Sequence, residues 1–286
     1  FSSRRRHTRF RNVTGVQTCA LPICLLMQLD GTAGLHGWQW LFLLEGLPAC
    51  LLSFLALLHL PSGPKEARFL TAEEKAAIAA RLAADGETAH RAFWPMFRDV
   101  RLYALGLVYL GYSVSYYGVQ LWLPQIVKAM GFSDLTTSFL VALPFAAAML
   151  AMIVWGRSSD ARGERIWHVA LPALAAFAGL SVASLSGSNA VVFASLTLVL
   201  VGLMSLQGPF WALPPAILGG TAAAGGIAFI NTIGTGAGGF LGPTLVGIVR
   251  GDTGGYGAAM AVLAVGPALT GLTVLWLSRR MPHRLQ

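Results

Sequence analysis

Polar and aromatic side chains that interrupt long apolar stretches are the residues of this chain best suited to bind a small polar ligand. A side-chain amide offers hydrogen-bond donors and an acceptor, and a tyrosine or tryptophan offers a ring face together with one polar atom. Some of them lie beside Gly208-Pro209 or just before Pro124, where a helix can loosen and expose backbone groups. The candidate ligand-binding residues are Asn231, Trp211, Gln120, Tyr117 and Gln207.

Each of these side chains also has a purely structural interpretation. An amide inside a membrane often does no more than bridge two helices by a hydrogen bond. Tyrosines and tryptophans near the end of a span commonly anchor it at the membrane surface, which is the role we favour for Trp122. Glu45 lies within an apolar stretch and is a candidate intramembrane ionisable group, with a structural hydrogen bond near the outer interface as the alternative.

A charged segment between two apolar stretches carries a second group of candidates. Residues 156–165 read Gly-x-x-x-Asp-x-x-Gly-x-Arg, with Gly156, Asp160, Gly163 and Arg165 at the fixed positions. A tight connection between two membrane spans needs glycine where backbones crowd, and arginine to hold the cytoplasmic face. It also needs an aspartate that accepts from the N–H groups at a helix end. We therefore predict a turn here that takes part in conformational change.

Glycines in the stretch after residue 222 are assigned to packing. Gly234, Gly236 and Gly239 formally match a dinucleotide-binding fingerprint, but no strand precedes them and no acid follows at the required distance. Gly234, Gly238 and Gly242 are spaced by four, which places small residues on one helix face for close packing against a neighbour.

The elements that must position these residues are membrane spans. The chain has 286 residues, of which 55% are hydrophobic and only 11% charged, and its mean hydropathy is +0.64. These values exclude a soluble domain of this size. Apolar runs of about twenty residues, enough to cross a hydrocarbon core of roughly 30 Å, occur seven times, so we predict an all-α polytopic membrane protein. The runs are 39–60, 102–127, 136–156, 166–185, 190–218, 222–249 and 256–278.

The basic N-terminus is predicted not to belong to the native protein. Five of the twenty Lys and Arg residues lie in the first twelve positions, which favours an anionic partner if the segment is native. However, residues 3–9 and 13–23 match one reading frame of a sequencing-library adapter, so we predict that residues 1–23 are adapter-derived and that nucleic acid is not a partner. Cys19 belongs to this segment, and Cys50 alone predicts neither a disulfide nor a metal site.

Charge asymmetry predicts the orientation and the organisation of the chain. When the spans are laid alternately across a bilayer, thirteen of the fifteen remaining Lys and Arg residues fall on one side, which is then cytoplasmic and holds the C-terminus. The segment 61–98 is a cytoplasmic linker with a capping box at Thr71–Glu74 and a helix at 72–84, either a bracket between two bundles or a solvated connection. Six spans follow within 99–286.

Three stretches carry a resemblance to a known family. They are GWQWLFLLEGLP (37–48), WGRSSDARGERIWHVALP (155–172) and GGIAFINTIGTGAGGFLGP (225–243), and they resemble the anion:cation symporters of the major facilitator superfamily over residues 24–286. The resemblance implies that 39–60 is the sixth of twelve spans, that 24–29 is a stub of the fifth, and that 99–286 is the C-terminal six-helix bundle. It also favours Asn231 and Trp211 as ligand-lining. Ala161 departs from the family turn, which often has a basic residue there.

The resemblance implies a secondary active transporter of organic anions, such as carboxylates or sugar acids, that works by alternating access with H⁺ or Na⁺ as co-substrate. It would be a monomer without a cofactor in the inner or plasma membrane, and this chain would be a truncated, inactive fragment. Between residues 102 and 249 all acids are predicted in loops, so the coupling acid would lie elsewhere. A structural half-protein that dimerises is one alternative. A membrane enzyme is the other, but no two ionisable catalytic groups share a predicted depth.

Overall fold

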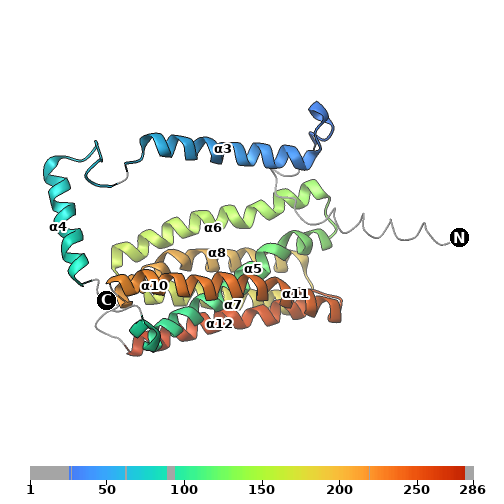
Figure 1. Ribbon diagram of the computed structural model, residues 1–286. Helices are drawn as coiled ribbons and strands as arrows, with labels where there is room; N and C mark the ends of the chain where they lie inside the picture. Colours follow the sequence, from blue (N-terminus) through green and yellow to red (C-terminus); the bar gives the residue numbers. More distant parts are fainter. Residues whose placement is uncertain (1–25, 27, 62, 89–93, 219, 281–286) are drawn as a thin grey trace.

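The fold is all-α, as predicted. The computed structural model describes residues 26, 28–61, 63–88, 94–218 and 220–280, and within these ranges it contains helices and no strand (Figure 1). Residues 1–23, which we assign to an adapter, lie outside the described ranges. Six helical segments in the described part of the chain are long and apolar enough to cross a membrane, which confirms a multi-pass integral membrane protein.

The helices follow the predicted spans closely. A 3₁₀ turn at Trp94–Arg98 precedes the bundle, and a π-helical segment at Thr232–Gly238 joins two of its helices. The α-helices are α3 (Gly37–His59), α4 (Ala72–Thr88), α5 (Val100–Ala129), α6 (Asp134–Arg162), α7 (Ile166–Leu185), α8 (Asn189–Trp211), α9 (Leu213–Leu218), α10 (Gly220–Asn231), α11 (Gly239–Thr253) and α12 (Gly257–Arg280).

Helix α5 lies at the centre of the bundle and contacts α8, α11, α12 and the π-helical segment. It is not among the six apolar helices, because tyrosine, serine and glutamine side chains lower its hydropathy. Two of its polar side chains bind neighbouring backbones: Ser115 Oγ donates to the Leu263 carbonyl at 2.6 Å, and Trp122 Nε1 donates to the Pro243 carbonyl at 3.0 Å. Thr270 of α12 donates to the Val108 carbonyl at 2.9 Å. Such interhelical bonds are typical glue within membrane bundles.

The glycine face predicted after residue 222 is confirmed. A Cβ added to Gly234 would overlap the ring of Tyr109, and one added to Gly238 would lie 2.6 Å from Ser113 Cβ. At Gly242 it would overlap the carbonyl oxygen of Val114. All three positions therefore need glycine because the backbone approaches α5 too closely for any side chain.

Two predicted spans are broken helices. The run 190–218 divides into α8 and α9 at Ala212, soon after Pro209, which supplies no backbone donor. The run 222–249 divides into α10, the π-helical segment and α11. Four glycines stand within or beside the π-helical segment, and glycine permits backbone departures that other residues resist. Both breaks lie near candidate ligand-binding residues.

Helix α3 stands apart from the bundle, to which the chain returns through α4 (Figure 1). The most apolar part of α3 contains no buried residue, and Phe42 and Leu57 are 70% and 84% exposed. Glu45 is also exposed, and among the described residues it has no hydrogen-bond or ion-pair partner, so the structural hydrogen bond considered for it is not observed. A face this apolar requires lipid or another protein surface.

The linker helix α4 begins with the predicted capping box and continues to Thr88, four residues past the predicted end. The Glu74 backbone N–H donates to Thr71 Oγ1 at 3.2 Å, and the Glu74 carboxylate accepts from the Thr71 N–H at 2.9 Å. Hydrogen bonds from the Thr71 backbone and hydroxyl lower the pKa of Glu74.

This lowered pKa predicts an acid-sensitive helix start. Folding depresses the pKa of Glu74. The contribution of its carboxylate to helix stability is therefore fully present above the ordinary carboxyl range and is lost as the pH falls through the lowered pKa. In a peptide covering residues 68–88, acidification through that range should reduce the helical circular dichroism signal. The Thr71→Ala peptide should start less helical and change less on acidification; equal changes in both peptides would contradict the capping assignment.

Candidate functional site

A ladder of aromatic rings on α5 positions the candidate Trp211. Tyr109 stacks on Phe210 with ring centroids 5.2 Å apart and meets Trp211 edge-on at 4.8 Å. Tyr109 also stacks on Tyr112 at 5.3 Å, and the Tyr112 ring stacks in turn on Tyr116 at 5.5 Å. These distances are within the range of favourable aromatic pairs. The ladder therefore fixes Trp211 at the break between α8 and α9.

Two further candidates follow Tyr116, at the end of the ladder. Tyr117 is half-buried and meets Tyr116 edge-on at 5.3 Å. Gln120, one turn further along α5, has its Oε1 atom buried with no hydrogen-bond partner in the described structure. An unpaired buried amide oxygen costs free energy, so this atom is suited to accept from a bound group or water.

Asn231 lies at the end of α10, directly before the π-helical segment. Its side chain is exposed, and its Oδ1 atom accepts a hydrogen bond from Thr235 Oγ1 at 2.7 Å. Gly234, three residues later, packs on the ring of Tyr109. Asn231 is thus connected through one turn to the Tyr109–Trp211 pair. Gln207, one turn before Trp211 on α8, is half-buried.

The predicted turn at 156–165 is mostly helix. Helix α6 continues to Arg162, so only residues 163–165 leave the helix, and Gly163 ends it with φ of +65°. Glycine is required at 163 for this left-handed conformation and not for crowding. A Cβ on Gly156 would meet nothing within 4 Å, so crowding does not explain Gly156 either.

The carboxylate that binds helix N–H groups here is Glu164, and the assignment of this role to Asp160 was wrong. Glu164 Oε1 accepts from the Trp167 N–H at 2.7 Å and Oε2 from the His168 N–H at 3.2 Å. Asp160, in the last turn of α6, instead pairs with Arg165 at 2.6 Å. Arg165 also donates to Ser159 Oγ at 2.8 Å, so both predicted charged residues join α6 to the start of α7.

His168 is 4% exposed and shares this junction. Its Nδ1 lies 2.7 Å from Glu164 Oε2, and its Nε2 lies 3.2 Å from Ser158 Oγ. Two ionisable groups therefore do share one depth, contrary to the sequence analysis. The same carboxylate caps α7 and orients the imidazole, which indicates a rigid junction between α6 and α7.

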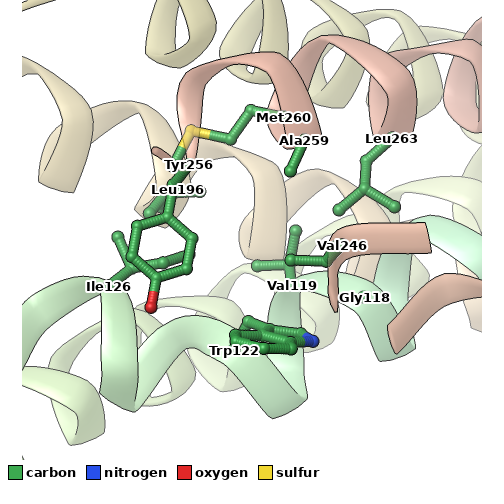
Figure 2. Close-up of a pocket in the computed structure, with 10 residues that line it drawn as sticks. All are labelled: Gly118, Val119, Trp122, Ile126, Leu196, Val246, Tyr256, Ala259, Met260 and Leu263. Atoms are coloured by element: carbon green, nitrogen blue, oxygen red, sulfur yellow. The ribbon is translucent and has the colours of Figure 1, made fainter. Parts of the chain in front are cut away.

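A very small apolar pocket, with a volume of about 10 Å³, lies at the opposite end of the bundle, between α5, α8, α11 and α12 (Figure 2). Trp122 lines it, and the Arg250 guanidinium lies 5.4 Å from the Trp122 ring and 4.5 Å from the Tyr256 ring. Burial raises the pKa of the Tyr256 hydroxyl, an effect that the Arg250 charge opposes. Trp122 is tied to α11 rather than free at the surface, which differs from the anchoring role predicted for it.

Comparison with known proteins decides the family. The sequence pattern of the Major Facilitator Superfamily matches residues 31–243. The chain belongs to this superfamily. A putative tartrate transporter of Agrobacterium vitis is 37% identical over 99% of this chain and 67% of its own length. A quinolone resistance transporter of Acinetobacter baumannii is 36% identical over 84% of this chain and 56% of its own length. A putative metabolite transport protein, NicT of Pseudomonas putida, is 33% identical over 91% of this chain and 60% of its own length.

The facilitator chain therefore spans 56% to 67% of the length of these relatives. Their names describe transporters, in agreement with the prediction that the protein is a membrane transporter and not an enzyme. Residues that the sequence analysis missed in this facilitator are Tyr109, Tyr112, Glu164 and His168. The spacing of three and four between Tyr109, Tyr112 and Tyr116 was the available signal, because such spacing aligns side chains on one helix face.

Glu164 offers a stability test of the facilitator's α6–α7 junction. Glu164→Ala removes the cap of α7 and leaves a buried imidazole without its partner, so the unfolding free energy should fall by about 1–2 kcal/mol. The expected result is a lower thermal midpoint of the purified protein in detergent. Asp252→Ala is the control, since Asp252 is exposed near the end of α11; an equal midpoint for the two variants would contradict the capping role.

Proposed function

We propose that this chain forms the C-terminal part of a secondary transporter for organic anions. The observation that carries the proposal is the exposed amide of Asn231 at the break of one membrane span. Gly234, three residues later, packs on Tyr109, which in turn contacts Trp211 at the break of a second span. Polar groups within membrane spans are costly unless they face a binding site or a water-filled cavity. Broken helices that meet near the membrane midplane are the usual setting for substrate in transporters.

The substrate class is proposed as small carboxylates or sugar acids. Two of the similar proteins are named as putative tartrate transporters, so tartrate is the first ligand to test. Asn231 and Trp211 would line the site, with Tyr117, Gln120 and Gln207 as further contacts. Gly156, Asp160, Gly163 and Arg165 would act at the α6–α7 junction during rocking of the bundle.

Coupling to H⁺ or Na⁺ is proposed to depend on residues outside this bundle. Asp134 begins α6, Asp160 lies in its last turn, and Glu164 follows it. These carboxylates stand at helix ends, where water reaches them, and not at the depth of Asn231. Glu45 of α3 remains a candidate ionisable group. We further propose a monomer in the inner or plasma membrane with a cytoplasmic C-terminus.

Uptake by the full-length protein in proteoliposomes tests this function. A panel of radiolabelled organic acids, supplied with and without pH and Na⁺ gradients, should give saturable uptake of at least one acid, accelerated by one gradient. Neutral and cationic analogues should not be taken up. Uptake of neutral or cationic compounds alone would contradict the assignment to organic anions, and indifference to both gradients would contradict symport.

A further inference from the structure

The hydrogen bond between Thr235 and Asn231 differs from those of four other threonines in the bundle. Thr197, Thr232, Thr244 and Thr253 each donate to the backbone carbonyl four residues earlier, at 2.9, 2.8, 2.6 and 2.7 Å. That is the ordinary bond of a helical threonine. Thr235 donates instead to the side-chain Oδ1 of the residue four positions earlier, at 2.7 Å.

The π-helical segment accounts for this difference. Thr235 lies inside Thr232–Gly238, where backbone hydrogen bonds run to the fifth residue and not the fourth. The carbonyl that a threonine would meet in an α-helix is displaced there. The hydroxyl therefore reaches the amide of Asn231, and the segment is kept in place because Gly234 and Gly238 pack directly on α5.

This bond decides which atoms of Asn231 remain available. A side-chain amide has one oxygen acceptor and one NH₂ group with two donors. With Oδ1 accepting from Thr235, the exposed amide presents Nδ2 and its two N–H donors. A ligand at this position must then supply acceptor atoms, and a carboxylate supplies two acceptor oxygens and no donor.

The surroundings favour an anion further. The carboxylates of α6 and of its junction with α7, at Asp134, Asp160 and Glu164, lie at helix ends, so they leave the donors of Asn231 to a ligand. Gly234, three residues after Asn231, packs on the ring of Tyr109, which meets Trp211 edge-on at 4.8 Å.

We propose that Thr235 is a positioning residue that orients the Asn231 amide so that its N–H donors face the substrate, which makes the site selective for carboxylate oxygens. The proposal rests on the proposed transport of organic anions and adds the physical origin of its charge preference. Without the Thr235 hydroxyl, the amide can turn and present its oxygen, which repels a carboxylate and accepts from a ligand amide.

Kinetics of the full-length protein in proteoliposomes test this role. Thr235→Val removes the hydroxyl at nearly constant volume. It should raise KM for tartrate about three- to tenfold, the usual worth of one hydrogen bond, with Vmax nearly constant. Inhibition of tartrate uptake by the neutral diamide of tartrate should be unchanged or stronger, so the preference for acid over amide falls. Thr235→Ser keeps the hydroxyl and should have the KM and the acid preference of the unmodified protein.

Thr232→Val is the matched control, because it deletes a hydroxyl in the same segment that binds only the Ala228 carbonyl. It should leave KM and the preference for acid unchanged. The positioning role would be overturned if Thr235→Val weakened the binding of tartrate and of its diamide equally. It would also be overturned if Thr232→Val raised KM as much as Thr235→Val does. If the unmodified protein takes up no organic acid, the proposed function is wrong. If the unmodified protein takes up the acid and Thr235→Val has the same KM and the same preference for acid, only the role of Thr235 is wrong.

Discussion

Asn231→Ala should reduce uptake of an organic acid by roughly ten- to a hundredfold at concentrations well below KM. A hydrogen bond to a charged group is worth about 1.5–3 kcal/mol, and alanine removes both donors of the exposed amide. Trp211→Ala should cause a similar loss, because Trp211 contacts both Tyr109 and Phe210 and its removal leaves the broken end of α8 unsupported. Initial uptake rates in proteoliposomes measure both effects.

Matched substitutions separate this loss from general damage. Asn189→Ala changes an exposed asparagine at the start of α8, and Trp167→Ala changes an exposed tryptophan at the start of α7. Both should retain uptake, and all four variants should be inserted in the membrane at equal levels. Unaltered kinetics in Asn231→Ala and Trp211→Ala would remove these residues from the site.

Gly242→Val should have the largest effect on stability. A Cβ at this position overlaps the Val114 carbonyl oxygen and lies 2.9 Å from the Gly118 nitrogen. These are backbone atoms of α5 and cannot turn aside, so α11 must move away from the centre of the bundle. We expect a loss of about 3 kcal/mol or more, at the upper end of overpacking effects, measured as a lower thermal midpoint in detergent.

Gly251→Val is the control on the same helix. A Cβ at Gly251 meets nothing within 4 Å, so this substitution carries the same change in helix propensity without the overlap. Its thermal midpoint should stay close to that of the unmodified protein. A comparable fall in both variants would show that helix propensity, and not contact with α5, governs the result.

The sequence was sufficient to place most of the membrane spans and the glycine face that packs on α5. Hydrophobic runs placed 166–185 to the residue, because a membrane span must satisfy its backbone internally and so begins and ends with the apolar run. The four-residue spacing of Gly234, Gly238 and Gly242 predicted a packed face because helical periodicity is a local property. Whether the proposed site residues bind substrate stays a prediction.

Features that depend on partners from other helices were not predictable. The charged segment at 156–165 looks like a loop by composition, yet buried Ser159 and the Arg165–Asp160 pair extend α6 through it. Glu164 takes the role predicted for Asp160 because the carboxylate of Glu164 faces the first turn of α7, whereas that of Asp160 pairs with Arg165. Likewise, Tyr109 appears in the sequence as one more aromatic residue, and only contact with Phe210 and Trp211 places it at the centre of the ladder.

The separation of α3 from the bundle has a consequence for handling the molecule. Helices α5 to α12 share one buried core that includes Leu105, Leu200 and Leu263, whereas the most apolar part of α3 contributes no residue to this core. A protease that cuts within α4 would therefore release no core residue. Each of the two products would stay in the lipid by its own hydrophobicity. The nicked protein would migrate as two bands, while the part that contains α5 to α12 kept its melting behaviour.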